Sequence, residues 1–195
     1  MSLRRIVLVR HGETDGESSV RFHGSTDVDL SKLGEAQMRA TAGRLVPPPS
    51  ELVVASPLKR SWRSAVILGC GAPVRLEDDF REIDFGRWEG LTREEIRATD
   101  PVLYDEWQQG AAGFDFPGGE RREAFRERVG RGLDRLLGMR AHSAMAVLHK
   151  GVIREVVSRL TGEPLPPGEP DLGEPLVLIR GANGSWTARR GEGTV

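Results

Sequence analysis

Short, unbroken apolar runs are the feature that most restricts how this chain can fold. Ile6 to Val9, Leu52 to Ala55 and Ala144 to Leu148 each contain only four or five residues, and all of them are apolar. Such runs are typical of strands buried on both faces of a parallel sheet, whereas a half-buried antiparallel strand alternates apolar and polar residues. These three runs therefore predict the centre of a largely parallel sheet.

Helical patterns separate the expected strands. Capping signals and apolar periodicity predict the longer helices over residues 32–45, 57–68, 120–137 and 152–160. Ser31 is expected to cap the first of them, and Ser56 to cap the second with Pro57 at its first position. Because strands and helices alternate along the chain, we predict a three-layer α/β/α sandwich with a mostly parallel central sheet.

Weaker signals fill the remaining segments. They predict a third strand over residues 74–76, short helices after Thr92 and Asp100, and a C-terminal edge hairpin of strands 176–179 and 186–188. Residues 1–195 are expected to form a single domain, since this length suits one core. Within it, about 88–118 is expected to be a helical cap or lid, and 191–195 is expected to be disordered.

Charge and composition exclude several classes of partner. The 28 Lys and Arg nearly balance the 29 Asp and Glu, so no strong overall field favours nucleic acid or an anionic membrane, and any anion must be recognised locally. The single cysteine, Cys70, excludes an internal disulfide framework and a zinc cluster of thiolates. No apolar stretch approaches the roughly 20 residues of a membrane span. We expect a soluble, cytoplasmic protein.

Histidines stand at the ends of two predicted strands. His11 and His149 directly follow buried runs, Arg10 and Lys150 flank them, and Arg60 lies early in the helix after another strand. Ligands of open α/β sheets bind at the carboxyl ends of strands. Because guanidinium forks and helix N-termini suit phosphate oxygens, the sequence predicts a crevice for a phosphate group.

Several motifs, in order along the chain, resemble those of the histidine phosphatase superfamily, also called the phosphoglycerate mutase-like family. The motif residues are Arg10-His11-Gly12-Glu13-Thr14 and the segments 21–24, 55–60, 82–90, 116–120 and 149–154. Residues 82–86 and 116–120 resemble the branch of broad-specificity phosphatases and α-ribazole phosphatase rather than the mutases.

The resemblance implies a role for particular residues. His11 would accept the phosphoryl group, Arg10, Arg60 and His149 would surround its oxygens, and Glu82 would be the acid. Sequence chemistry alone leaves Glu82 nearly tied with Asp79 and Asp84. The further substrate-binding candidates are Ser18, His23, Gly24 and Lys150.

Three positions depart from the family pattern. Glu17 stands where the family often has Asn, so either Glu17 turns away from the phosphate or Ser18 substitutes. His23 stands where many members have Gln, which leaves a phosphate contact and a loop-packing role open. Lys150 replaces a frequent Gly and either reaches the substrate or points to solvent.

The expected function is hydrolysis of a small-molecule phosphomonoester through a phosphohistidine on His11. No cofactor is expected, and no metal, since the four histidines lack the short spacing of a metal site. The alternatives are a mutase that transfers the phosphoryl group between positions of one substrate, and a non-catalytic module that binds a phosphorylated ligand. The sequence leaves the oligomeric state open.

Overall fold

The computed structural model describes residues 3–45, 51–69 and 71–190. The segment 191–195, which was expected to be disordered, lies outside these ranges, as do Cys70 and the prolines at 47–49. The strands of the described chain are β1 (Arg5–Arg10), β2 (Leu52–Ala55), β3 (Val74–Leu76), β4 (Ser143–Leu148), β5 (Pro175–Arg180) and β6 (Trp186–Arg190).

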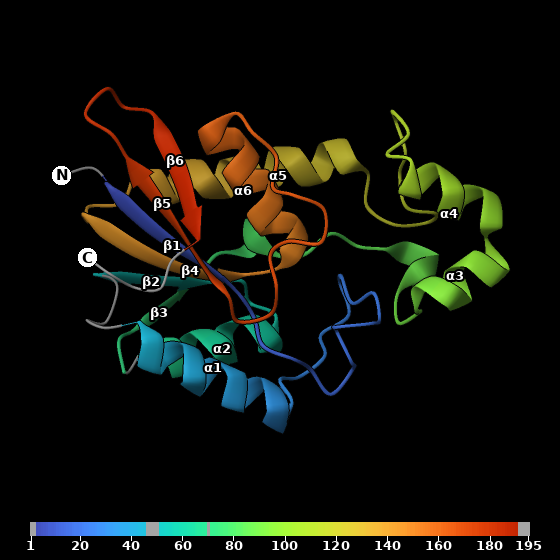
Figure 1. The fold of residues 1–195 in the computed structure, drawn as a ribbon, viewed down its shortest axis with the longest axis horizontal. Coiled ribbons are helices and arrows are strands. Elements are labelled where there is room, and N and C mark those ends of the chain that lie inside the picture. The colour runs from blue at the N-terminus through green and yellow to red at the C-terminus, as the bar shows by residue number, and fades with distance from the viewer. Residues whose placement is uncertain (1–2, 46–50, 70, 191–195) are drawn as a thin grey trace.

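These strands form one sheet in the order β3-β2-β4-β1-β5-β6 (Figure 1). The neighbours from β3 to β1 are all parallel, whereas β5 runs antiparallel to β1 and to β6. The predicted mostly parallel sheet with a C-terminal edge hairpin is therefore confirmed.

Strand β1 shows why an unbroken apolar run is needed. Ile6 and Leu8 face one hydrophobic cluster, Val7 and Val9 face the other, and all four side chains are fully buried. Because successive side chains of a strand point to opposite faces, a strand with a core on both sides requires apolar residues throughout. The sheet thus separates two cores.

Helices cover both faces of the sheet, which confirms the three-layer α/β/α prediction (Figure 1). Helices α1 (Lys32–Arg44) and α2 (Lys59–Leu68) lie on one face, and α5 (Arg122–Leu137) and α6 (Lys150–Thr161) lie on the other. Helices α3 (Arg93–Thr99) and α4 (Pro101–Gln108) lie beyond the carboxyl ends of the parallel strands. In the described part of the chain, no helix has the length and hydropathy to cross a membrane.

Two helix starts differ from the prediction. Helix α2 begins at Lys59 rather than Pro57, because the Ser56 hydroxyl accepts from the Leu58 N–H within a turn that precedes the helix. Helix α6 begins at Lys150, two residues before Val152. Its N-cap is His149, so the strand passes directly into the helix there. The predicted Ser31 cap of α1 and the Thr92 capping box of α3 are both confirmed.

The segment between β3 and α3 contains two short 3-10 turns, Asp78–Phe80 and Gly86–Trp88. The second turn buries Trp88 against the rings of Trp107, Phe114 and Phe116, with centroids 5.6 to 6.0 Å apart. Edge-to-face packing of this kind ties the α3–α4 segment to the loop that precedes it.

Candidate active site

The carboxyl ends of β1, β2 and β4 meet at one edge of the sheet. Arg10 is opposite Leu148 in the parallel ladder, and Ala55 is opposite Val147. The His11 N–H continues the ladder by donating to the Leu148 carbonyl oxygen at 3.0 Å. This register brings the rings of His11 and His149 together, with centroids 5.2 Å apart.

The hydrogen bond of His11 fixes its tautomer. Its Nδ1 lies 2.8 Å from the Gly12 carbonyl oxygen, which can only accept, so Nδ1 carries the hydrogen and Nε2 keeps its lone pair. The ring is 4% exposed. Burial, with the nearby Arg60 and Arg10 charges, holds the pKa of His11 well below its usual range. His11 is therefore a neutral imidazole near pH 7.

Two arginines are held beside these rings by backbone carbonyls. The fully buried Arg60 donates to the carbonyl oxygens of His23, Gly24 and Thr26 at 2.7 to 3.0 Å. Arg10 donates to the carbonyls of Ser18 and Pro170. Burial lowers the pKa of Arg60 to about 10, which still leaves it charged at neutral pH.

The buried polar atoms without a hydrogen-bond partner lie close to His11 and His149. Throughout the described ranges, the buried side-chain nitrogens and oxygens without a hydrogen-bond partner are Nε of Arg10 and Arg60, both ring nitrogens of His149, and Nδ1 of His23. Buried polar groups normally find partners, and an exception calls for an explanation. Here the exceptions share one neighbourhood, which fits a site built to receive an anion.

Other side chains hold the Arg60 clamp in shape. The Glu89 carboxylate accepts from the backbone N–H groups of Gly24, Ser25 and Thr26, which fixes the loop whose carbonyls bind Arg60. A Cβ on Gly24 would lie 1.8 Å from the Ile83 carbonyl oxygen, so only glycine fits there.

The carboxyl group of Glu82 lies in the same cavity. Its Oε1 accepts from the Ile83 N–H at 3.0 Å, and its Oε2 accepts from the Gly151 N–H at 2.9 Å. Burial raises the pKa of Glu82, although these N–H groups and the charges of Arg60 and Arg10 oppose the shift. Of the three carboxylates that sequence chemistry left tied, Glu82 lines the cavity, whereas Asp79 pairs with Arg131 and Arg135.

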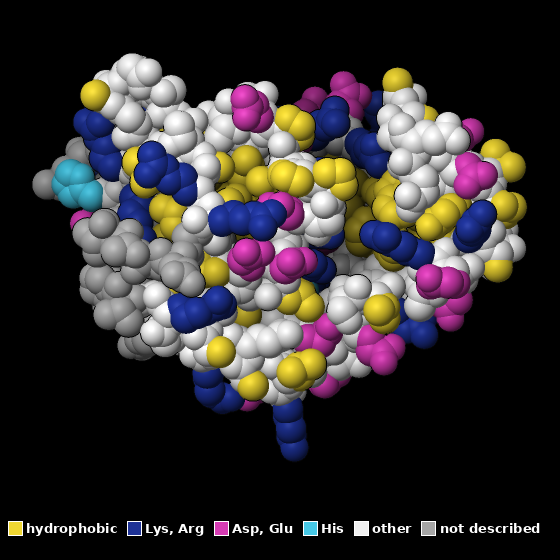
Figure 2. All heavy atoms as spheres, in the orientation of Figure 1, with side chains coloured by type: hydrophobic (Ala, Val, Ile, Leu, Met, Phe, Trp, Pro, Cys, Tyr) yellow, Lys and Arg dark blue, Asp and Glu magenta, His cyan; other side chains and the backbone are white. Residues whose placement is uncertain are grey.

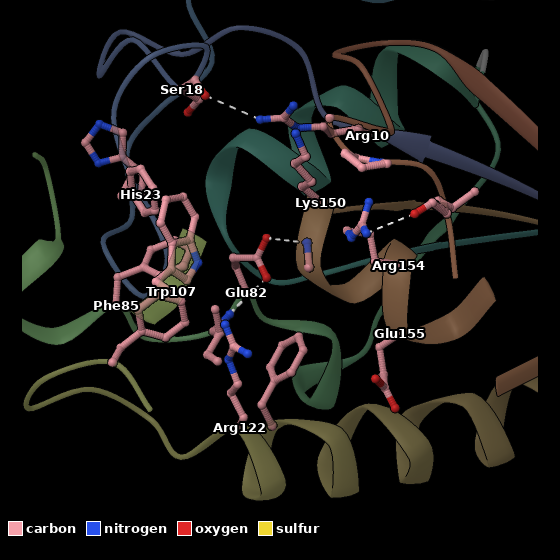
Figure 3. Close-up of a pocket in the computed structure, with 18 of the residues that line it drawn as sticks. Arg10, Ser18, His23, Glu82, Phe85, Trp107, Arg122, Lys150, Arg154 and Glu155 are labelled. Atoms are coloured by element: carbon pink, nitrogen blue, oxygen red, sulfur yellow. Dashed lines mark hydrogen bonds between the residues drawn. The ribbon is translucent and has the colours of Figure 1, made fainter. Parts of the chain in front are cut away.

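The cavity has a volume of about 620 Å³, and its lining residues come from the α/β/α sandwich and from the α3–α4 segment. On the molecular surface it is a hollow with Lys and Arg side chains at its edge (Figure 2). Its lining combines the site residues with aromatic and basic side chains from separate segments (Figure 3). The aromatic and basic members include Phe22, Phe85, Trp107 and Phe116, and Arg93, Arg122, Arg126, Lys150 and Arg154.

Comparison with known proteins identifies the family to which the chain belongs. The model of the histidine phosphatase superfamily (branch 1) matches residues 6–170. The chain belongs to this superfamily. A bifunctional protein of Mycobacterium tuberculosis is 36% identical over 149 residues, which make up 74% of this chain and 41% of that protein. A glucosyl-3-phosphoglycerate phosphatase of the same species is 39% identical over 124 residues, 63% of this chain and 55% of that protein. The chain thus spans only about two-fifths to just over half of these relatives.

Solved structures of the superfamily share the whole fold. A mycobacterial glucosyl-3-phosphoglycerate phosphatase is 28% identical with a TM-score of 0.82, covering 98% of this chain and 100% of its own. A putative alpha-ribazole-5'-P phosphatase from Escherichia coli K-12 is 25% identical with a TM-score of 0.83, covering 96% and 95%. The branch that the motifs indicated is therefore confirmed.

The structure places the predicted superfamily site residues as follows. His11, Arg10 and Glu82 line the cavity, whereas Arg60 and His149 are not part of the lining and are buried close to His11. Ser18, His23 and Lys150 also line it, although His23 Nε2 is in contact with the Gly16 carbonyl oxygen. Gly24 is not part of the lining, since its backbone serves Arg60 and Glu89.

Glu17 turns away from the site. Its side chain is 68% exposed and pairs with Arg21 at 3.3 Å, whereas Ser18 faces the cavity. The Glu17 carboxylate therefore points away from the cavity, where it would not repel a bound phosphate.

The sequence analysis did not predict most of the basic residues that line the cavity. Arg93, Arg122, Arg126 and Arg154 come from α3, α5 and α6, and no superfamily motif contains the first three. The only sequence signal for these arginines is the high proportion of arginine in the segments that flank the motifs. Trp107 of α4 also lines the cavity. Within the described ranges, no group of three or more His, Cys, Asp or Glu could hold a metal ion.

Proposed function

We propose that this protein hydrolyses a small phosphomonoester through a phosphohistidine formed on His11. The observation that carries the proposal is the set of unpartnered buried donors on Arg10, Arg60 and His149 around a neutral imidazole. A phosphoryl group seated on His11 would satisfy these donors together, because its three equatorial oxygens spread their charge toward them.

In the first step, the lone pair of His11 Nε2 attacks phosphorus and the bond from phosphorus to the ester oxygen breaks. The Nδ1 hydrogen bond to the Gly12 carbonyl oxygen supports the positive charge that develops on the ring. Glu82 gives its proton to the departing alkoxide, and its raised pKa suits this task. The products are the free alcohol, phosphohistidine and a Glu82 carboxylate.

In the second step, the Glu82 carboxylate takes a proton from water while the water oxygen attacks phosphorus. The bond between phosphorus and Nε2 breaks, inorganic phosphate leaves, and His11 and Glu82 return to their starting states. The route calls for no metal, because a side chain is the nucleophile and Arg10 and Arg60 supply the positive charge.

The lining supports a role for the α3–α4 segment as a cap. Arg93 of α3 and Trp107 of α4 both line the cavity, and the segment lies at the carboxyl ends of the strands. Substrate selectivity would then reside mainly in this segment, since such insertions vary on a fixed scaffold. The phosphatase names of several relatives favour hydrolysis of a phosphorylated metabolite over transfer.

Hydrolysis is tested by following p-nitrophenyl phosphate and 3-phosphoglycerate in EDTA, with readouts for both inorganic phosphate and isomer. We expect phosphate release by the wild type and almost none by His11→Ala. Isomer formation without free phosphate would indicate a mutase instead. Equally slow release by wild type and His11→Ala, with equal ligand binding, would indicate a binding module.

A further inference from the structure

The cavity carries more positive charge than one phosphoryl group requires. Its lining includes seven basic residues (Arg10, Arg21, Arg93, Arg122, Arg126, Lys150 and Arg154) but only two acidic ones, Glu82 and Glu155. The whole chain, in contrast, has a formal charge of -1. The cavity therefore has a local excess of positive charge that the molecule as a whole does not have, and this excess favours an anionic ligand.

Four of these cations are already engaged, whereas the side chains of Arg93, Arg122 and Lys150 have no ion pair or hydrogen bond within the described ranges. Arg21 and Arg126 form ion pairs, and Arg10 and Arg154 donate to backbone carbonyls. Among the described residues, the guanidinium of Arg122 has neither an ion pair nor a hydrogen bond. The other arginines at and along α5, in contrast, each pair with an acidic side chain: Arg121, Arg126, Arg128, Arg131 and Arg135.

Aromatic rings hold Arg122 in place. Its guanidinium carbon lies 5.0 Å from the centroid of Phe114 and 5.6 Å from that of Phe116. The nearby Asp115 attracts the Arg122 charge but forms no ion pair with it, since Asp115 accepts from the Arg122 backbone N–H and its Oδ2 lies 4.0 Å from Arg121 Nε. A cation stacked in this way keeps its donors free at the edge of the plane.

Arg122 is well separated from the phosphoryl clamp. In the close-up it extends from α5 into the cavity, on the opposite side of Glu82 from Arg10 and Lys150 (Figure 3). A ligand held by both groups must therefore extend across the cavity past the acid, and a volume of about 620 Å³ leaves room for it.

We propose that Arg122 is a specificity residue that binds a second acidic group of the substrate, a carboxylate or a second phosphate, while the scissile phosphoryl group lies on His11. This inference rests on the proposed function. The guanidinium fork can donate two parallel hydrogen bonds to such a group, which would raise the affinity about tenfold to hundredfold over a neutral analogue.

The test uses three probes of similar size: para-carboxyphenyl phosphate, its neutral para-carbamoyl analogue and para-phenylene bisphosphate. Affinities are measured by calorimetry on the His11→Ala variant, so that they do not depend on turnover. In that background Arg122→Met removes the charge, Arg122→Lys keeps it, and Arg121→Met is the matched control. The Arg121 side chain is 71% exposed and pairs with Glu123 outside the cavity lining.

We expect the carboxylate or the bisphosphate to bind at least tenfold more tightly than the carbamoyl probe, and whichever does so identifies the acidic group. Arg122→Met should remove this preference without weakening the carbamoyl probe, Arg122→Lys should keep part of it, and Arg121→Met all of it. Equal or undetectable binding of all three probes, or equal weakening of all three by Arg122→Met, would overturn the inference. Phosphate release by the wild type tests the proposed function separately.

Discussion

At the scale of single residues, burial shifts the pKa values of His11 and Glu82 in opposite directions. The imidazole is pushed toward its neutral form and the carboxyl toward its protonated form. A nucleophile needs a lone pair and an acid needs a proton. One desolvated cavity therefore prepares both groups, and the charges of Arg10 and Arg60 counteract this only for Glu82.

The first prediction concerns the pH dependence of kcat/KM. The rate should rise as His11 loses its proton, at a pH well below 6.5, and fall as Glu82 loses its proton, at a pH above 4.5. Glu82→Gln should lower turnover of an alkyl phosphate by about 10²- to 10⁴-fold and remove the falling limb. The loss should be smaller with p-nitrophenyl phosphate, whose leaving group needs little protonation. Unchanged limbs in Glu82→Gln would show that another group is the acid.

The second prediction concerns Lys150. Burial and the charges of Arg10, Arg154 and Arg93 lower its pKa to about 8, with only Asp171 opposing. Below pH 8 the ammonium is charged, and above it the charge is lost, so KM for a phosphate ester should increase about two- to tenfold between pH 7 and 9. Lys150→Met should have a KM that no longer changes in this interval, and Lys150→Arg should keep the low KM to higher pH. A wild-type KM that stays constant would exclude a contact between Lys150 and the substrate.

The candidate site residues could be selected from the sequence because most of them stand at strand ends, although only the family resemblance distinguished Glu82 from Asp79 and Asp84. His11, Arg60, Glu82 and His149 each directly follow, or lie close to, a recognisable strand end or loop. Arg122 could not be selected in this way, since an arginine at the start of an arginine-rich helix is ordinarily solvated. Only the tertiary contacts show that, among the described residues, the other arginines of α5 have acidic partners and Arg122 has only ring contacts.

At the scale of elements, the start of α6 positions the carboxyl group of Glu82. The Gly151 N–H donates to Glu82 Oε2, and a Cβ on Gly151 would lie 2.5 Å from Oε1. On the other side, Arg128 of α5 donates to the carbonyl oxygens of Asp79, Arg81 and Glu82. Two helices from different parts of the sequence therefore fix one carboxyl group.

The third prediction follows from this contact. Gly151→Ala should displace the Glu82 carboxyl and lower kcat about tenfold or more, with a smaller effect on KM, because a displacement of about 1 Å can reduce a rate a hundredfold. The matched control is Gly43→Ala in α1, where an added Cβ meets nothing within 4 Å. That variant should keep full activity and gain about 0.5 to 1 kcal/mol of stability, measured by urea unfolding. Wild-type kcat in Gly151→Ala would show that the acid does not depend on α6.

Sequence patterns predicted elements well where one residue type decides the conformation. The Ser31 cap and the Thr92 capping box fixed their helix starts. The Ser56-Pro57 signal predicted the wrong start for α2, because a serine hydroxyl can accept a hydrogen bond in a turn as well as at a helix cap. Tertiary contacts decide which of the two forms. Ser61, one such contact, accepts from the Ser56 N–H and donates to the Val147 carbonyl oxygen of β4.

At the scale of the whole molecule, the site connects every layer. Its residues come from β1, α2, the loop after β3, α5 and α6, so an anion bound there contacts segments from both sides of the sheet. The order of the layers could be predicted from apolar runs and helix periodicity. The cavity lining could not, because it depends on where the α3–α4 segment lies relative to α5 and α6, and no local sequence pattern determines that arrangement.

The fourth prediction uses this arrangement. Orthovanadate at a hundred times its Kd should raise the free energy of unfolding by about 2.7 kcal/mol and Tm by roughly 5 to 10 °C. Arg10→Met should lose most of this shift, whereas Arg39→Met, which removes an exposed arginine paired with Glu35 on α1, should keep it. Equal shifts in both variants would place the oxyanion elsewhere.

The central claim is that His11 carries the phosphoryl group during turnover. It is tested most directly by acid-free quenching of the enzyme during steady-state hydrolysis, followed by intact-mass and peptide analysis. We predict one added phosphoryl group, labile to acid and located on His11, in the wild type and none in His11→Ala. A fully active wild type that never shows this adduct, or an adduct that persists on another residue in His11→Ala, would contradict the account.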